Sequence, residues 1–164
     1  MNKFDLTSLY SLQKALDEEI HSLHQESYET TFQKRELALL VELGEFANET
    51  RCFKFWSLKK PSEKETILDE YADAIHFFLS LGIAIGNESL VGEVEPTYFD
   101  LTKQLLLVYE EVALFSLSSK LEDYKTAFLD FLAILPLLGY SQDDLFIAYK
   151  KKLEVNYKRQ ENHY

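Results

Sequence analysis

A chain of 164 residues with 46% hydrophobic and 27% charged residues is long enough to bury a core, and this balance excludes an intrinsically disordered protein. The net charge of −11 weighs against duplex nucleic acid or an anionic membrane as a partner. A bound divalent cation can nevertheless bring a single nucleotide to an acidic site, because the cation reverses the local charge.

Helix start signals recur along the chain. Capping-box or closely related spacing begins at Thr30, Ser62, Thr97 and Ser119, and acidic residues follow Ser141. Only 5 Gly and 3 Pro occur and alternation with a period of two is absent, so we expect no strands and interpret 87–97 as a loop. The sequence predicts an all-α fold, a single-domain helical bundle over residues 1–164 with about six helices: 7–24, 33–52, 63–85, 98–117, 121–137 and 142–161.

Cellular location is constrained by the cysteine count and by hydropathy. Cys52 is the only cysteine, which rules out an intrachain disulfide and favours a reducing compartment. The first ten residues lack an apolar signal region, and no run approaches the ~20 apolar residues of a membrane span. We therefore expect a cytoplasmic protein without a membrane partner.

The predicted helix 33–52 carries acidic residues on a face bordered by apolar ones. Glu42, Glu45 and Glu49 fall in one narrow sector of the helical wheel, and spacings of three and four bring their like charges together. Most of the remaining surface is a broad apolar arc made of Leu37, Leu40, Val41, Leu43, Gly44 and Ala47. A single such pair usually marks a solvated helix face.

A second pair of acids makes a merely solvated helix face a less satisfactory explanation. Glu70 and Asp73 are three residues apart on the predicted helix 63–85, which is apolar on most sides. Unpaired buried carboxylates are costly, so a cation is expected nearby. Two facing pairs would surround one point with oxygen ligands, which suits Mg²⁺, with Mn²⁺ as a substitute.

A di-iron centre is the rival metal site. Asp73 and His76 form a D-x-x-H pair, and di-iron bundles combine glutamates with such carboxylate–histidine pairs. The other histidine pair, His21 with His24 on the first helix, is more typical of ordinary helix surface. The carboxylate set therefore favours magnesium.

Basic and aromatic residues supply candidate substrate contacts. Trp56, the only tryptophan, follows the acidic helix and could either stack on a base or pack against the protein. The neighbouring lysines, Lys59 included, could either contact phosphates or interact with the negative end of the helix dipole. On the last helix, Lys152, Asn156 and Arg159 share a narrow sector. This stripe could bind a polyphosphate chain or be a solvated face.

Taken together and in order, these segments resemble the dimeric all-α dUTPase family, which is related to the MazG-like all-α NTP pyrophosphatases. The resemblance covers nearly the whole chain, and four segments carry it: Gln13 to Asp17, Glu42 to Glu45 with the continuation Arg51 to Ser57, Glu70 to Phe77, and Tyr149 to Gln160.

The resemblance implies an enzyme, a homodimeric hydrolase that converts dUTP and dUDP to dUMP. It implies Mg²⁺ held by Glu42, Glu45, Glu70 and Asp73, with Glu42 or Glu45 as the base that activates a water. Lys152, Asn156 and Arg159 would contact phosphates, and Gln13 and Trp56 the uracil region. Two alternatives stay open: a related pyrophosphatase for dCTP or modified nucleotides, and a non-catalytic acidic helical module.

Overall fold

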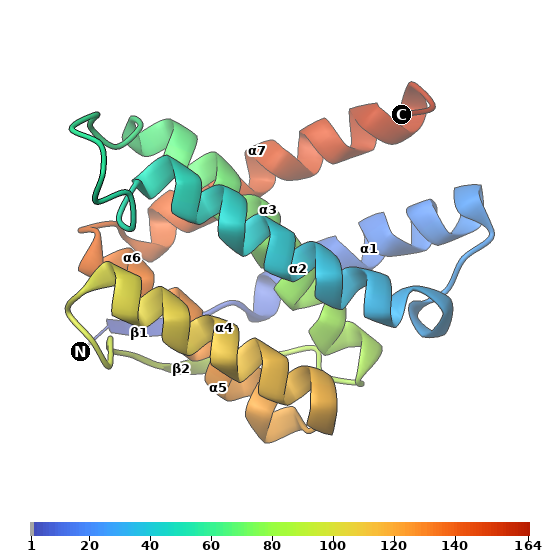
Figure 1. The fold of residues 1–164 in the computed structure, drawn as a ribbon. Helices are drawn as coiled ribbons and strands as arrows, with labels where there is room; N and C mark the ends of the chain where they lie inside the picture. The colour runs from blue at the N-terminus through green and yellow to red at the C-terminus, as the bar shows by residue number, and fades with distance from the viewer. Residues whose placement is uncertain (1) are drawn as a thin grey trace.

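The computed structural model describes residues 2–164, and Figure 1 shows them as a bundle of helices with a small sheet at one edge. The prediction of an all-α fold is confirmed. Within the described residues there are six long helices and one short one: α1 Thr7–His24, α2 Tyr28–Thr50, α3 Lys64–Ala84, α4 Leu101–Ser118, α5 Leu121–Leu132, α6 Ile134–Leu137 and α7 Gln142–Glu161.

Two helices begin elsewhere than predicted, because different residues cap them. The helix expected over 33–52 starts at Tyr28, since Ser27 accepts a hydrogen bond from the Thr30 amide while the Thr30 hydroxyl accepts one from the Ser27 amide. The helix expected from 98 starts at Leu101, since the Asp100 carboxylate accepts from the Lys103 amide. Both caps satisfy amides that the first turn leaves without partners.

Two of the predicted caps serve other purposes. Ser62 does not cap α3, because the N-cap residue of that helix is Glu63, which makes no side-chain capping bond. The Ser62 hydroxyl instead donates to the Glu49 carboxylate. Ser119 ends α4 in the left-handed conformation, with φ 53°, rather than starting α5. The single helix expected over 121–137 divides at Ala133 because Pro136 has no amide hydrogen and its ring crowds the preceding turn.

The prediction that strands are absent is wrong for two short segments. β1 Asn2–Asp5 and β2 Val91–Val94 pair antiparallel, with Phe4 opposite Gly92. A side chain at Gly92 would lie 2.8 Å from Leu129 on α5, so glycine lets this strand lie directly against the helix. The segment 87–97 is therefore not simply a loop.

The centre of the bundle is α3, which packs against α1, α2, α5 and α7. Aromatic rings fill the space between α3 and α5: Tyr71 stacks on Phe131 at 4.2 Å and Phe78 on Phe128 at 4.6 Å between ring centroids. Burial of such rings supplies much of the stabilisation of a core. This central position fixes α3 firmly, and the same helix carries residues that line the candidate site.

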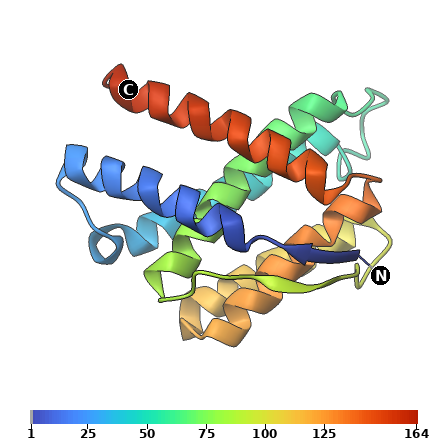
Figure 2. The same cartoon turned by 180° about the vertical axis from the view of Figure 1, so that it is seen from behind.

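Helices α1 and α7 run alongside each other on one side of α3, as Figure 2 shows from behind. Near their C-terminal ends the His24 imidazole and the Gln160 amide lie within hydrogen-bond distance, at 2.9 Å. A cleft between α1, α2, α3 and α7 results.

Within residues 2–164 no single helix is long and apolar enough to cross a membrane. One pair of segments, 121–137 and 142–161, passes the same test of length and composition when the two are taken together, but they are bent by 111° relative to each other.

Candidate active site

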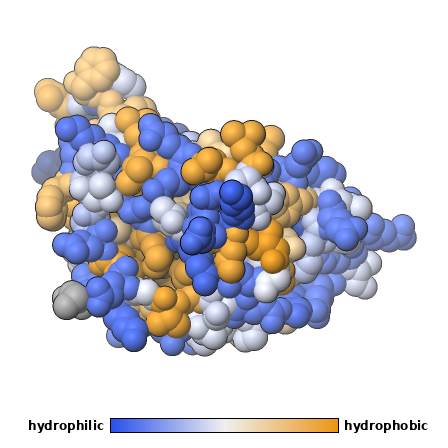
Figure 3. Space-filling view, turned by 90° about the horizontal axis from the view of Figure 1, so that it is seen from below, coloured by the Kyte–Doolittle hydropathy of each residue, from blue (hydrophilic) through white to orange (hydrophobic). Residues whose placement is uncertain are grey.

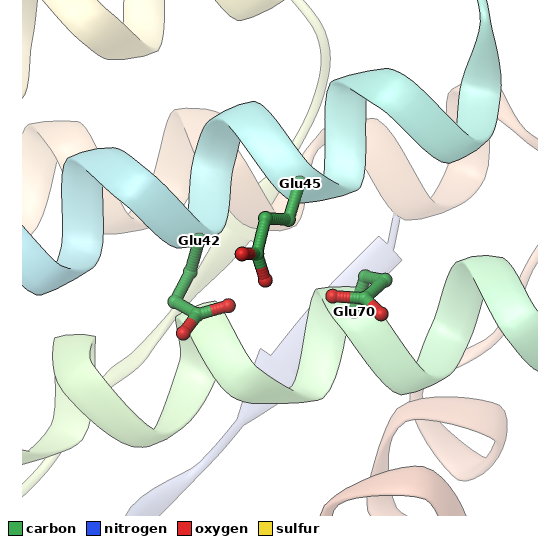
Figure 4. Close-up of side chains that lie close together, drawn as sticks. All are labelled: Glu42, Glu45 and Glu70. Carbon is green, nitrogen blue, oxygen red and sulfur yellow. The ribbon is translucent and has the colours of Figure 1, made fainter.

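Carboxylates from α2 and α3 point toward one another in the space between the two helices (Figure 4). One oxygen from each of Glu42, Glu45 and Glu70 lies within 4.8 Å of the others, and Asp69, Glu70 and Asp73 form a second such group. Glu45 is exposed whereas Glu42, Glu70 and Asp73 are partly buried. The acids thus line an open edge of the bundle rather than its interior.

Like charges and burial make this cluster electrostatically unfavourable when it holds no cation. Burial first, and then the neighbouring carboxylates of Asp73, Glu45 and Glu70, raise the pKa of Glu42 from 4.5 to about 8. Burial and nearby acids also raise the pKa of Glu70 to about 6, and burial raises the pKa of Asp73. One oxygen of Glu42 is fully buried without any hydrogen-bond partner. An all-oxygen donor set with an unpartnered atom fits a hard divalent cation.

Lys152 of α7 reaches the α3 side of the cluster. Its ammonium lies 3.0 Å from carboxylate oxygens of both Asp69 and Asp73, and its side chain is only 6% exposed. Although burial opposes its charge, the two hydrogen bonds raise the pKa of Lys152. Lys152 therefore supplies a buried positive charge at the edge of the carboxylate cluster.

The cleft between α1, α2, α3 and α7 joins this cluster to other predicted site residues. It encloses about 460 Å³ and includes Glu42 and Asp73 at the carboxylate end. Asn156 and Arg159 of α7 line it, as does Gln13 of α1. Side chains expected to contact metal, phosphate and base thus share one cavity.

Gln13 lines the same cleft and takes part in a buried hydrogen-bond network. Its amide nitrogen donates to Asp17 at 2.9 Å, and its carbonyl oxygen accepts from the Tyr149 hydroxyl at 2.9 Å. The Nδ1 atom of His76 lies 2.6 Å from the same carbonyl oxygen, and the imidazole stacks on the Tyr149 ring. The contacts of His76 are therefore with Gln13 and Tyr149 rather than with Asp73.

Sequence reasoning missed Arg35 and Asp17, which extend this network. The Arg35 Nε donates to the Ser80 hydroxyl at 2.7 Å, and that hydroxyl donates to Asp17 at 2.7 Å. Arg35 also lies 3.9 Å from the Asp17 carboxylate. The signal for Arg35 in the sequence was weak, because Lys34 and Glu36 flank it and long charged side chains on a helix often extend to solvent.

Three other residues singled out from the sequence lie outside this cleft. Trp56 is 65% exposed and packs edge-on against Phe53 and Phe55 in the segment between α2 and α3. Lys59 is exposed in the same segment. Glu49 binds Ser62 instead of joining the other acids of α2, so it anchors that segment.

Comparison with known proteins gives the family. A family model described as dUTPase matches residues 5–164, which is nearly the whole chain. Among curated proteins, none matches the chain. The family match spans the four ordered segments, the carboxylate cluster and the cleft together. The chain therefore belongs to the dUTPase family and is a dUTP diphosphatase, a hydrolase that acts on the acid anhydride bonds of a nucleotide.

Proposed function

We propose that this dUTP diphosphatase is magnesium-dependent, with Glu42, Glu45, Glu70 and Asp73 holding Mg²⁺, or Mn²⁺ in its place. The observation that carries the proposal is the convergence of carboxylates from α2 and α3, including a buried Glu42 oxygen without a partner. A bound ion of this kind would neutralise the cluster, hold substrate phosphates and lower the pKa of the attacking water.

Glu42 and Glu45 are the proposed bases for that water. Both lie on the same face of α2, and a carboxylate in this position can accept the proton released when the water attacks phosphorus. Glu42→Gln and Glu45→Gln separate the roles. The variant of the base should lose kcat while Mg²⁺ still binds, whereas the variant of a ligand should lose Mg²⁺ affinity as well, measured by calorimetry.

The substrate is proposed to lie along the cleft, with its base near Gln13 and its phosphates near α7. Arg159 and Asn156 present one cation and one amide there, and Lys152 can exchange Asp73 for a phosphate oxygen when the carboxylate is otherwise neutralised. Trp56 and Lys59 are also proposed to contact the substrate. Both lie in the exposed segment between α2 and α3, and they would reach the substrate if that segment folded over the cleft.

A panel of the deoxynucleoside triphosphates with Mg²⁺, with product identification, tests the assignment. Clear preference for dUTP, with release of dUMP and pyrophosphate, is expected, and dUDP should yield dUMP and phosphate. Faster turnover of dCTP or of a modified nucleotide would favour the related pyrophosphatase of other specificity. Activity that persists after chelation of divalent ions would refute the proposed metal dependence.

We also propose a homodimer, because α2 and α4 expose an apolar face. Figure 3 views the molecule from the α4 and α5 side, where hydrophobic side chains interrupt the hydrophilic surface. Leu37 and Val41, which belong to the apolar arc of α2, are 64% and 51% exposed, and Leu106, Leu114 and Leu117 of α4 are exposed too. Leu114→Glu should yield monomers in light scattering, whereas the exposed Leu23→Glu on α1 should leave the dimer intact.

A further inference from the structure

Two carboxylates of α3 share the ammonium group of Lys152. Asp69 and Asp73 stand about one helical turn apart, and an oxygen of each lies 3.0 Å from the Lys152 Nζ atom. The Lys152 side chain is 6% exposed, whereas the Asp69 side chain is 46% exposed. An ammonium group carries three donors, so the two carboxylates leave one that can meet a phosphate oxygen.

The two carboxylates face different cavities. Asp73 lines the cleft between α1, α2, α3 and α7. Asp69 lines a separate cavity of about 340 Å³ between the N-terminal parts of α3 and α7, which Leu68 and Ala148 also line. Asp69 therefore contacts Lys152 from outside the cleft, and it can keep this contact when a substrate occupies the cleft.

The stability of the fold does not account for the second carboxylate. Asp73 alone would supply the counter-charge that the buried Lys152 needs, and an exposed partner such as Asp69 adds little to an ion pair. Asp69 also brings a further negative charge to within 4.8 Å of Glu70 and Asp73, and like charges repel. A carboxylate that adds repulsion and little stability indicates another role.

Resting on the proposed binding of Mg²⁺ by Asp73 and of phosphate by Lys152, we propose that Asp69 is a positioning residue that holds the Lys152 ammonium toward the substrate phosphates. Once its charge is shared with a cation, the Asp73 carboxylate attracts Lys152 less strongly. The lysine ammonium sits on a flexible four-carbon stem, so without a second partner it would spread over several orientations. The contact with Asp69 keeps the ammonium in one place.

Two substitutions of Asp69 separate positioning from a general effect of its charge. A hydrogen bond to a charged group is worth a factor of about 10 to 100, so Asp69→Ala should lower kcat/KM for dUTP at saturating Mg²⁺ by about tenfold or more. Asp69→Asn also loses the charge but keeps an oxygen that accepts from Lys152, so it should lose clearly less. Equal losses in the two variants would show an effect of charge alone and would overturn the proposal.

Glu65→Ala is the matched control. Glu65 also lies on α3 and lines the same cavity as Asp69, and it pairs at 2.6 Å with Lys151, the neighbour of Lys152 on α7. Both members of this pair are exposed, so kcat/KM should change by less than about twofold. A loss as large as that of Asp69→Ala would refute a specific role for Asp69.

A double-mutant cycle tests whether Asp69 acts through Lys152. If Asp69 only positions the ammonium, Asp69→Ala should change kcat/KM by less than about twofold in the Lys152→Met background. The same tenfold loss in both backgrounds would contradict the proposal.

Two binding measurements by calorimetry need no turnover. In Asp69→Ala the affinity for Mg²⁺ alone should stay within about threefold of wild type, because an exposed charge acts weakly, and a larger loss would make Asp69 a metal ligand instead. The dissociation constant of the non-hydrolysable analogue α,β-imido-dUTP should rise by about tenfold or more, whereas that of deoxyuridine, which has no phosphate, should change by less than about twofold. An equal loss for the two ligands would indicate a general defect of the cleft and would overturn the proposal.

The outcome for Lys152→Met separates this inference from the proposed function. Turnover equal to wild type in Lys152→Met would remove the phosphate contact proposed for Lys152, and with it the role of Asp69. A loss in Lys152→Met without any loss in Asp69→Ala would leave the phosphate contact in place and refute only the positioning by Asp69.

Discussion

Protons and Mg²⁺ compete for the same carboxylates, so the affinity for Mg²⁺ should depend on pH. Without the ion, the pKa of Glu42 is about 8 and that of Glu70 about 6. At pH 6 Glu42 is therefore almost fully protonated and Glu70 about half protonated, whereas a glutamate with the ordinary pKa of 4.5 is almost fully ionised. The metal binds the deprotonated form. Affinity should therefore rise with pH, by about tenfold per unit below pH 8 from Glu42 alone.

From pH 8 to pH 6, the loss of ionised Glu42 lowers the affinity by a factor of about 50, and the half-protonation of Glu70 at pH 6 lowers it by about 2 more. Glu42 is only partly buried, and solvent screening reduces this effect, so a total change of at least about tenfold is the expected outcome. Titration calorimetry of Mg²⁺ at pH 6, 7 and 8 in buffers of different ionisation enthalpy measures both the affinity and the protons released. A dissociation constant that is the same at all three values would refute the reasoning.

The same shifts have a consequence for stability. Because the folded-state pKa of Glu42 lies above its unfolded value of 4.5, the metal-free fold binds more protons than the unfolded chain between pH 4.5 and about 8. The stability that this proton confers is therefore lost as pH rises through that range. The increase in melting temperature produced by Mg²⁺ should grow with pH, and Glu42→Gln should flatten this dependence.

Two further predictions concern charges whose partners are known. The carboxyl of Glu111 lies against that of Asp130, and burial, followed by this contact, raises the pKa of Glu111 from 4.5 to about 8. Stability is again lost as pH rises between these values, so Glu111→Gln should raise the melting temperature relative to wild type at pH 9 but not at pH 5. Lys152→Met leaves Asp73 without its ion-pair partner and should cost about 2 kcal/mol in urea unfolding without metal, with partial recovery in Mg²⁺. Lys151→Met removes only an exposed pair and should change stability by less than about 0.5 kcal/mol, and an equal loss in the two variants would contradict this.

Local patterns explain what the sequence could predict. Helical periodicity identified most of the bundle, and the spacings of three between Glu42 and Glu45 and between Glu70 and Asp73 put each pair on one helix face. The meeting of the pairs follows from the packing of α2 on α3, which two consecutive helices usually adopt. These features need little knowledge of contacts between distant residues.

The features that were missed depend on such contacts. β1 and β2 are each four residues long, so neither carries a periodic signal of its own, and three helices separate them in the sequence. Arg35 becomes a buried donor only because Ser80 and Tyr28 surround it, and His76 contacts Gln13, which lies 63 positions away in the sequence. The exposure of Leu37 could not be foreseen either, because a helical wheel marks an apolar face without showing what covers it.

One face of α3 connects the two ends of the cleft. Asp73, His76, Phe77 and Ser80 follow the spacing of three, four and seven that aligns residues on a helix, and all four line the cavity. Asp73 belongs to the carboxylate cluster, His76 contacts Gln13, and Ser80 accepts a hydrogen bond from Arg35. About 10 Å of helix separates Asp73 from Ser80. Because α3 is packed on several sides by the core, these groups cannot shift independently, so the distance between the carboxylate cluster and the hydrogen-bond network of Gln13 and Arg35 is fixed by the most buried helix of the fold.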